Sequence, residues 1–90
     1  MENTTPVVPC PCCGYLVYSC LDALDRYEIC PICFWETDGV QQDDPDYEGG
    51  ANGLSLNQAR ENFQEFGASN LRLKIFVRPP RSDEKRAGSR

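Results

Sequence analysis

The sequence predicts a small α+β domain, and three observations support this. The chain has 90 residues. That is enough for one domain with a marginal apolar core, because chains of this size bury only about 60–68% of their unfolded surface. Six cysteines are present, and four of them form two Cys-x2-Cys pairs. Downstream of the pairs lies a capped amphipathic pattern. We therefore expect a metal-stabilised fold with a β-hairpin, one covering helix and a third strand.

The two cysteine pairs predict a metal site. Cys10 and Cys13 form the first pair, Cys30 and Cys33 form the second, and 16 residues lie between the pairs. Two such pairs separated by roughly 15–20 residues are typical of a zinc site. Four thiolates complete a tetrahedral zinc shell, which leaves no position for a substrate and makes the site structural. We expect one zinc ion per chain, with iron as the alternative because four-sulfur sites accept both metals.

The other two cysteines, Cys12 and Cys20, stand outside this ligand set. Cys13 is preferred over Cys12 as a ligand because it gives the two-residue gap and precedes Gly14, which can adopt a positive φ. Phe34 follows the second pair, so that turn must close differently or hold a strained residue. Cys12 is either a buried hydrophobe or a reactive thiol beside the metal, and the same choice applies to Cys20. A disulfide framework is the alternative to a metal site, but two adjacent cysteines fit it badly.

A hairpin is expected over residues 9–36. Residues 15–18 are β-formers, and residues 25–29 alternate apolar with polar side chains. They predict two antiparallel strands that join the two Cys-x2-Cys turns, which we call knuckles. Residues 37–54 follow as an acidic, glycine-rich loop that is either solvated or binds a partner. A calcium loop is not expected there, because Ser55 stands where an EF-hand needs glutamate.

Residues 55–67 predict an amphipathic helix that covers the hairpin. Ser55 and Gln58 form a capping box at its start, and Gly67 can end it in a left-handed conformation. Four apolar residues recur at helical spacing on one face: Leu56, Ala59, Phe63 and Phe66.

The remaining segments lie at the two ends of the chain. Residues 71–77 alternate apolar and polar side chains with a period of two, which predicts a third strand. Residues 1–8 are expected to form a flexible lead-in and residues 81–90 a disordered basic tail. A single zinc domain would then span residues 9–80.

Several short motifs occur in an order that resembles one known family. They are Cys10–Tyr15, Tyr27–Glu36, Asp44–Tyr47, Gly49–Asn52, Leu54–Leu56, Ala59–Phe63, Glu65–Ala68 and Val77–Pro80. Together they resemble the bacterial cysteine-rich CPCC family over roughly residues 8–80. The resemblance implies a zinc-ribbon or rubredoxin-like pair of knuckles, and it implies no reaction. The ligand positions that it implies are Cys10, Cys13, Cys30 and Cys33. The chain departs from the family pattern between residues 16 and 26 and between residues 71 and 76.

Charge and composition narrow the expected partners and compartment. Residues 1–59 hold ten acids and one base, whereas residues 60–90 hold eight bases and four acids. An acidic main body opposes binding to phosphate backbones, so nucleic acid is not an expected partner. No apolar run reaches the roughly 18–20 residues of a membrane span. Residues 1–9 lack a signal-peptide pattern, so we expect a cytoplasmic protein.

The function expected from these observations is non-enzymatic. The chain has no histidine, which excludes Ser-His and Cys-His catalysis and any mixed Cys/His metal site. We expect a zinc protein that binds another protein through its acidic loop or an aromatic face. One alternative is a rubredoxin-like iron electron carrier, and another is a thiol redox switch at Cys12. The sequence does not indicate an oligomeric state.

Overall fold

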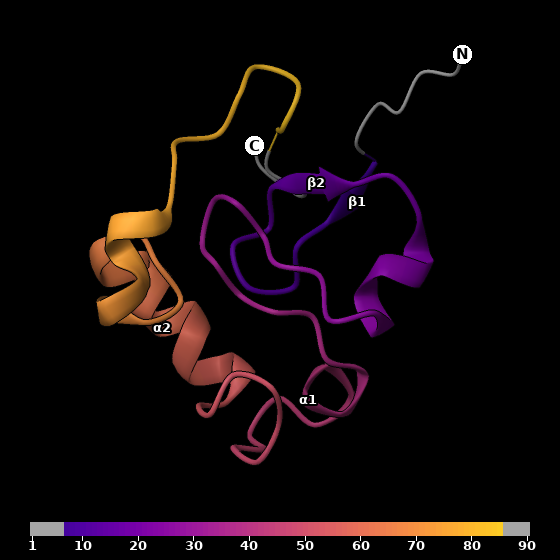
Figure 1. Ribbon diagram of the computed structural model, residues 1–90, viewed down its shortest axis with the longest axis vertical. Helices are drawn as coiled ribbons and strands as arrows, with labels where there is room; N and C mark the ends of the chain where they lie inside the picture. The colour runs from indigo at the N-terminus through magenta and orange to yellow at the C-terminus, as the bar shows by residue number, and fades with distance from the viewer. Residues whose placement is uncertain (1–6, 86–90) are drawn as a thin grey trace.

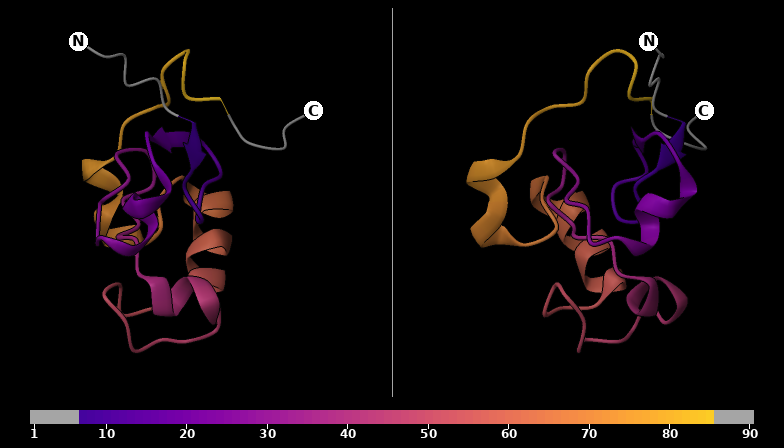
Figure 2. Two further views of the ribbon diagram at one scale, coloured as in Figure 1. Left: turned by 90° about the vertical axis from the view of Figure 1, so that its right-hand side faces the viewer. Right: turned by 45° about the vertical axis from the view of Figure 1, so that its right-hand side comes forward.

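The computed structural model describes residues 7–85 and is built around the two knuckles (Figure 1). In chain order it contains strands β1 (Val8–Pro9) and β2 (Leu16–Tyr18), 3₁₀ helix η1 (Leu21–Asp25), helices α1 (Gly39–Asp43) and α2 (Leu56–Phe66), and 3₁₀ helix η2 (Leu71–Phe76). The strands and η1 lie on one side, while α2 and η2 lie on the other (Figure 2). Within this part of the chain, no helix has the length and apolar character to cross a membrane.

The core surrounds the cysteines of the two knuckles. Trp35 and Leu56 are the bulkiest apolar side chains that are almost fully buried, at 1% and 0% exposure. Val8 and Ala59 join the same buried cluster, with Phe63 packed against it. Because few large apolar side chains reach this interior, sulfur atoms make up a substantial part of it.

The strand predicted at residues 15–18 is present as β2, but its predicted partner is wrong. β2 pairs antiparallel with β1, with Val8 opposite Tyr18 and Pro9 opposite Leu16. The segment 25–29 contributes only an isolated bridge between Ile29 and Glu36, across the second knuckle. One hairpin joining the knuckles therefore does not form. Each knuckle is closed by its own short pairing, because the residues that flank a tight turn are the nearest partners for each other.

The predicted acidic loop 37–54 contains a short helix, and buried side chains within the loop hold it through hydrogen bonds. The Asp38 carboxylate caps α1 by accepting hydrogen bonds from the backbone N–H groups of Val40 (2.9 Å) and Gln41 (3.4 Å). The buried Gln41 amide donates to the carbonyls of Tyr47 (2.9 Å) and Leu54 (2.8 Å). A helix this short is stable only with such support, and the same contacts shape the rest of the segment.

The predicted amphipathic helix is confirmed as α2. Ser55 and Gln58 form a capping box, and Gly67 ends the helix with φ of 84°. Leu56 and Ala59 are fully buried. The Phe63 ring packs edge-on against Tyr15, with ring centroids 6.3 Å apart. This contact joins α2 to the residue that follows the first knuckle.

The third strand predicted at residues 71–77 is wrong, because residues 71–76 form η2. The Asn70 side chain accepts a hydrogen bond from the backbone N–H of Arg72 (3.2 Å) and so starts the helical turn. Leu71 and Ile75, expected on the buried face of a strand, are 62% and 84% exposed. An alternating pattern produces a strand only where a sheet edge pairs with it, and here the Asn70 cap starts a helical turn instead.

The predictions for the two ends of the chain also need correction. Val8, assigned to the flexible lead-in 1–8, is 5% exposed in β1, and residues 1–6 lie outside the described residues. In the predicted disordered tail 81–90, Glu84 is buried and forms a bidentate ion pair with Arg78 (2.7 and 2.8 Å). The Lys85 carbonyl accepts a hydrogen bond from Leu16 N–H (2.9 Å). Residues 77–85 are therefore attached to the domain near both ends, through Arg78 to Pro31 and through Lys85 to Leu16, while residues 79–83 are exposed. Residues 86–90 lie outside the described residues.

Candidate metal centre

Four cysteine sulfurs from the two knuckles converge on one point. The Sγ atoms of Cys10 and Cys33 are 3.6 Å apart, and those of Cys13 and Cys30 are 3.8 Å apart. All four Sγ atoms lie within 4.8 Å of one another. Zinc–sulfur bonds of about 2.3 Å place the sulfurs of a tetrahedral site about 3.8 Å apart. The donor set therefore has the size and chemistry of a tetrahedral metal site.

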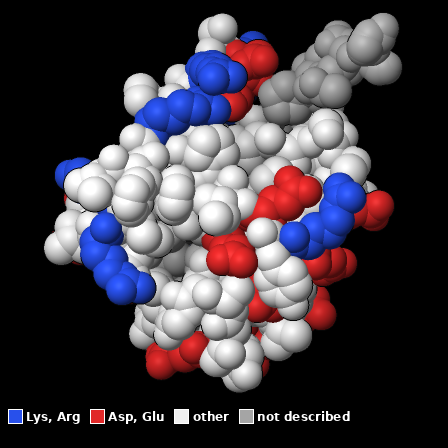
Figure 3. Space-filling view, in the orientation of Figure 1, with Lys and Arg blue, Asp and Glu red and all other residues white. Residues whose placement is uncertain are grey.

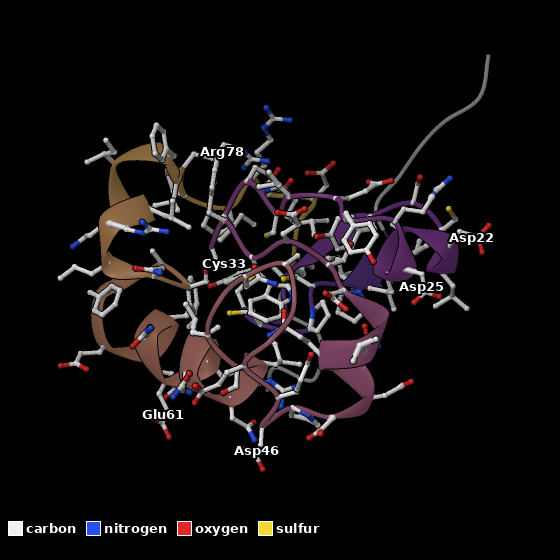
Figure 4. The ribbon with its side chains drawn as sticks, turned by 60° about the horizontal axis from the view of Figure 1, so that its bottom comes forward. Asp22, Asp25, Cys33, Asp46, Glu61 and Arg78 are labelled. Carbon is white, nitrogen blue, oxygen red and sulfur yellow. The ribbon has the colours of Figure 1, made fainter. Side chains whose placement is uncertain are left out.

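The four side chains of this cluster are almost completely removed from solvent. The exposed fraction is 1% for Cys10 and Cys13 and 0% for Cys30 and Cys33. Figure 4 shows Cys33 in the interior, among other sulfurs, while Asp46 and Glu61 extend away from it. A site closed in this way has no open face at which a substrate could reach a bound ion.

The two knuckles share one backbone geometry. In the first, Cys10 N–H donates to the Tyr15 carbonyl (2.9 Å) and Gly14 N–H donates to the Cys10 carbonyl (2.9 Å). The second repeats this pattern twenty residues later, from Cys30 to Trp35 (2.9 Å) and from Phe34 to Cys30 (2.8 Å). These bonds fix the direction in which each cysteine pair points.

Each knuckle also donates a backbone N–H group to one of its own sulfurs. The N–H of Cys12 points to Sγ of Cys10, and that of Ile32 points to Sγ of Cys30, both at 3.4 Å. Such bonds stabilise negative charge on sulfur and orient it toward a metal.

The second knuckle holds a strained residue where the first has glycine. Gly14 has φ of 82° and Phe34 has φ of 67°. A left-handed backbone is easy for glycine, whereas for a bulky side chain it costs on the order of 1–3 kcal/mol. Of the two outcomes expected for this turn, the structure shows the strained one. The Phe34 ring stacks on Phe76 of η2, with centroids 5.3 Å apart, and this contact offsets part of the strain.

Four sulfurs this close cannot all be thiolates without a cation. Hydrogen bonds from Cys10, and then from Cys13 and Cys33, hold the pKa of the Cys30 thiol well below its ordinary value. Burial raises the pKa of Cys10, and the contact with Cys10 raises that of Cys33. Without a metal, one negative charge is therefore stabilised at the expense of the others. A divalent cation is what allows the whole set to deprotonate.

The other two cysteines lie outside the cluster, and Cys13 rather than Cys12 is grouped with the remaining three. Cys12 is 8% exposed and belongs to the apolar core. Cys20 is exposed, with the Arg26 guanidinium 3.4 Å from its sulfur. All six cysteines are free, so the alternative of disulfides is wrong.

The four cysteines of this site lie within a segment that matches a known protein family. A family model described as cysteine-rich CPCC matches residues 8–84, almost the whole chain. The chain belongs to the cysteine-rich CPCC family. No curated protein matches the chain. The CPCC match includes both knuckles, α2 and most of the segment 77–85.

The CPCC domain supports its knuckles with three residues to which the sequence patterns assigned no contact. Arg60 of α2 donates through Nε to the Pro11 carbonyl in the first knuckle (2.9 Å). Arg78 donates through its backbone N–H to the equivalent carbonyl, that of Pro31, in the second (3.1 Å). Ser69 N–H donates to the Cys33 carbonyl (2.7 Å). These contacts join segments 36 to 49 positions apart, so no local motif could reveal them.

Proposed function

We propose that this CPCC protein is a small, cytoplasmic, non-enzymatic zinc protein. Cys10, Cys13, Cys30 and Cys33 would hold one structural zinc ion, and the folded domain would present a surface to another protein. The observation that carries the proposal is the buried cluster of four Sγ atoms within 4.8 Å of one another. Two features support a structural role: the closed donor set and the absence of histidine from the chain.

The metal is tested by elemental analysis of protein purified from cells without added metal. We expect one zinc per chain and no visible colour. Cys30→Ser should lose the metal, whereas Cys20→Ser should retain it, because Cys20 is exposed and outside the cluster. Zinc content that is equally unaffected by both substitutions would contradict the assignment of the site.

One observation favours the alternative of a rubredoxin-like iron electron carrier. The N–H···S bonds to Cys10 and Cys30 are of the kind that tunes the potential of iron–sulfur centres. If protein purified without oxygen contains stoichiometric iron and absorbs visible light, the electron-carrier function replaces the proposed zinc function.

The proposed protein-binding surface is the acidic segment 43–48. Asp43 and Asp44 are exposed. Asp46 and Glu48 accept hydrogen bonds from the α2 side chains of Asn57 (3.0 Å) and Gln58 (3.1 Å). The segment is therefore ordered before any partner arrives, which lowers the entropy lost on binding, and its charge suits a basic protein.

Crosslinking followed by pull-down from the native host tests this surface. The double substitution Asp43→Asn and Asp44→Asn should abolish capture of the partner. Glu61→Gln with Glu65→Gln makes the same change in charge on α2 and should leave capture intact. Equal capture by both variants would remove the acidic segment from the proposal.

A further inference from the structure

A pocket outside the metal centre lies between the second knuckle, the turn at residues 51–54 and η2. Its volume is about 230 Å³. Figure 3 views this side of the molecule, where a hollowed, uncharged area has a basic side chain on one side and acidic side chains on the other. Pockets for drug-sized ligands span roughly 300–1,000 Å³, so an occupant of this pocket would be a smaller molecule.

The pocket is lined by one acid and one base that have no ion-pair partners. Glu36 and Arg72 both line it. The ion pairs within residues 7–85 are Arg26–Glu28 and Arg78–Glu84, so the two pocket charges are paired neither with each other nor with another described residue. A cation and an anion left unpaired at one pocket can each bind an opposite charge on a single ligand.

Hydrogen bonds from neighbouring asparagine side chains hold the backbone of both charged residues. The Asn52 side chain accepts from Glu36 N–H (2.8 Å) and donates to the Glu36 carbonyl (2.7 Å). The Asn70 side chain accepts from Arg72 N–H (3.2 Å). The positions from which the two charges project are therefore set before a ligand binds, which favours binding by preorganisation.

Ser69 adds a buried polar group to the lining. It is 2% exposed, and its backbone N–H and carbonyl bond to Cys33 (2.7 Å) and to the Asn62 side chain (2.9 Å). Ser69 lines the pocket, and its hydroxyl can both donate a hydrogen bond to a ligand and accept one from it.

The comparison of the two knuckles gives a separate reason to look at this pocket. Glycine is sufficient to close the first knuckle, yet the second has Phe34 at the equivalent left-handed position. The Phe34 ring is part of the pocket lining, together with Leu54 and Leu73. Backbone strain of this kind concentrates at functional positions, and here it places an aromatic ring in the pocket wall.

We propose that this pocket binds a small amino acid, with Arg72 holding its carboxylate, Glu36 holding its ammonium group and Phe34 contacting its apolar part. Ser69 donates a further hydrogen bond to the carboxylate. The ligand class follows from two opposite unpaired charges beside an apolar wall. The spacing of the two ligand charges distinguishes α-amino acids from ω-amino acids, which share this chemistry.

Isothermal titration calorimetry on the metal-loaded protein tests the proposal, with L-leucine and L-phenylalanine as α-amino acids and 6-aminohexanoate as an ω-amino acid. Saturable binding of one class is expected. Arg72→Gln and Glu36→Gln should each weaken it about 10- to 100-fold, as expected for loss of one charge-assisted contact. Phe34→Gly restores the residue type of the first knuckle and should keep the metal, but it should bind more weakly, because it removes both the ring in the pocket wall and the ring on which Phe76 of η2 stacks.

Matched controls separate the pocket from net charge. Lys74→Gln removes a base from the same 3₁₀ helix, and Glu65→Gln removes an acid from α2. Neither residue lines this pocket, so both variants should bind like the unchanged protein. N-acetyl-leucine and leucinamide, which each lack one charge, should bind at least tenfold more weakly. The proposal is overturned if no probe gives saturable binding, if acetylated probes bind equally well, or if Arg72→Gln and Glu36→Gln leave binding unchanged.

Discussion

Asp38 illustrates, at the scale of single residues, how one buried side chain fixes a segment that contains little regular structure. It is 5% exposed, and one carboxylate oxygen accepts from Val40 and Gln41 while the other accepts from Ala51 N–H (2.9 Å). Thr37 acts in a similar way between η1 and the second knuckle, donating to the Ala23 carbonyl (2.7 Å) and accepting from Glu28 N–H (2.8 Å). Side-chain hydrogen bonds here replace the ladder that a larger sheet would supply.

Replacing Asp38 should therefore be more harmful than its place in an acidic loop suggests. Asp38→Ala is expected to destabilise the metal-loaded protein by about 2–3 kcal/mol, because three backbone N–H groups, one of them buried, lose their acceptor. Urea denaturation measures the change. Asp43→Ala, at an exposed position of the same helix, should change stability by less than about 0.5 kcal/mol. Equal effects at the two positions would contradict the structure.

The ion pair between Arg78 and Glu84 should make stability depend on pH. Its hydrogen bonds from Arg78 hold the pKa of Glu84 below its ordinary value. The folded pKa then lies below the unfolded value of about 4.3. The stabilisation is complete above that value and is lost as pH falls through the folded pKa, because the unfolded chain binds the proton more tightly.

The difference in stability between the unchanged protein and Glu84→Gln isolates this contribution. It should be constant near neutral pH and shrink as the solution is acidified below about pH 4.3. NMR titration of the Glu84 carboxyl carbon measures the pKa directly. A midpoint at or above the unfolded value would show that the ion pair does not form in solution.

At the scale of elements, α2 and η2 each contain four apolar residues but have different roles. α2 has both caps and buries Leu56 and Ala59. η2 buries none of its residues, and its main support is the stacking of Phe76 on Phe34. Apolar residues in η2 therefore contribute far less to the core than the alternating pattern suggests.

Truncation of one apolar residue in each element should separate these roles. Leu56→Ala should cost about 2–5 kcal/mol, since Leu56 is fully buried. Ile75→Ala should cost less than about 0.5 kcal/mol, because Ile75 is 84% exposed. Thermal unfolding followed by circular dichroism compares them. A large loss from Ile75→Ala would mean that residues 71–77 pack as a strand after all.

On the scale of the whole molecule, the candidate metal centre joins two segments that are distant in the sequence. The two knuckles come from residues 10–13 and 30–33, and within residues 7–85 the named strands form a single two-stranded sheet. Zinc binding contributes about 10–16 kcal/mol in small zinc-binding peptides. That exceeds the net stability of most domains of this size, so folding and metal binding should be coupled.

Removal of the metal should therefore unfold the protein. Treatment with a strong chelator is expected to abolish the cooperative thermal transition, and added zinc should restore it. Circular dichroism and the dispersion of amide proton resonances report the change. If chelated protein that has lost its metal melts at the same temperature as untreated protein, the core is stable without a metal and this account is wrong.

Features that depend on short spacings could be predicted from the sequence. Cys10, Cys13, Cys30 and Cys33 could be singled out because two residues between cysteines suit a knuckle. α2 could be predicted because its caps and apolar stripe lie within 13 consecutive positions, residues 55–67. These signals are local, because residues that are close in the sequence determine the conformation of the knuckles and of α2.

Contacts between segments settled which of them became partners. The pairing of β2 with β1 and the attachment of residues 77–85 to Leu16 and Pro31 depend on what lies beside each segment in space. An alternating pattern expresses a capacity to pair, but the Asn70 side chain caps a helical turn at residues 71–76 instead. Partner choice is a property of the assembled chain, because the competing contacts come from residues that are distant in sequence.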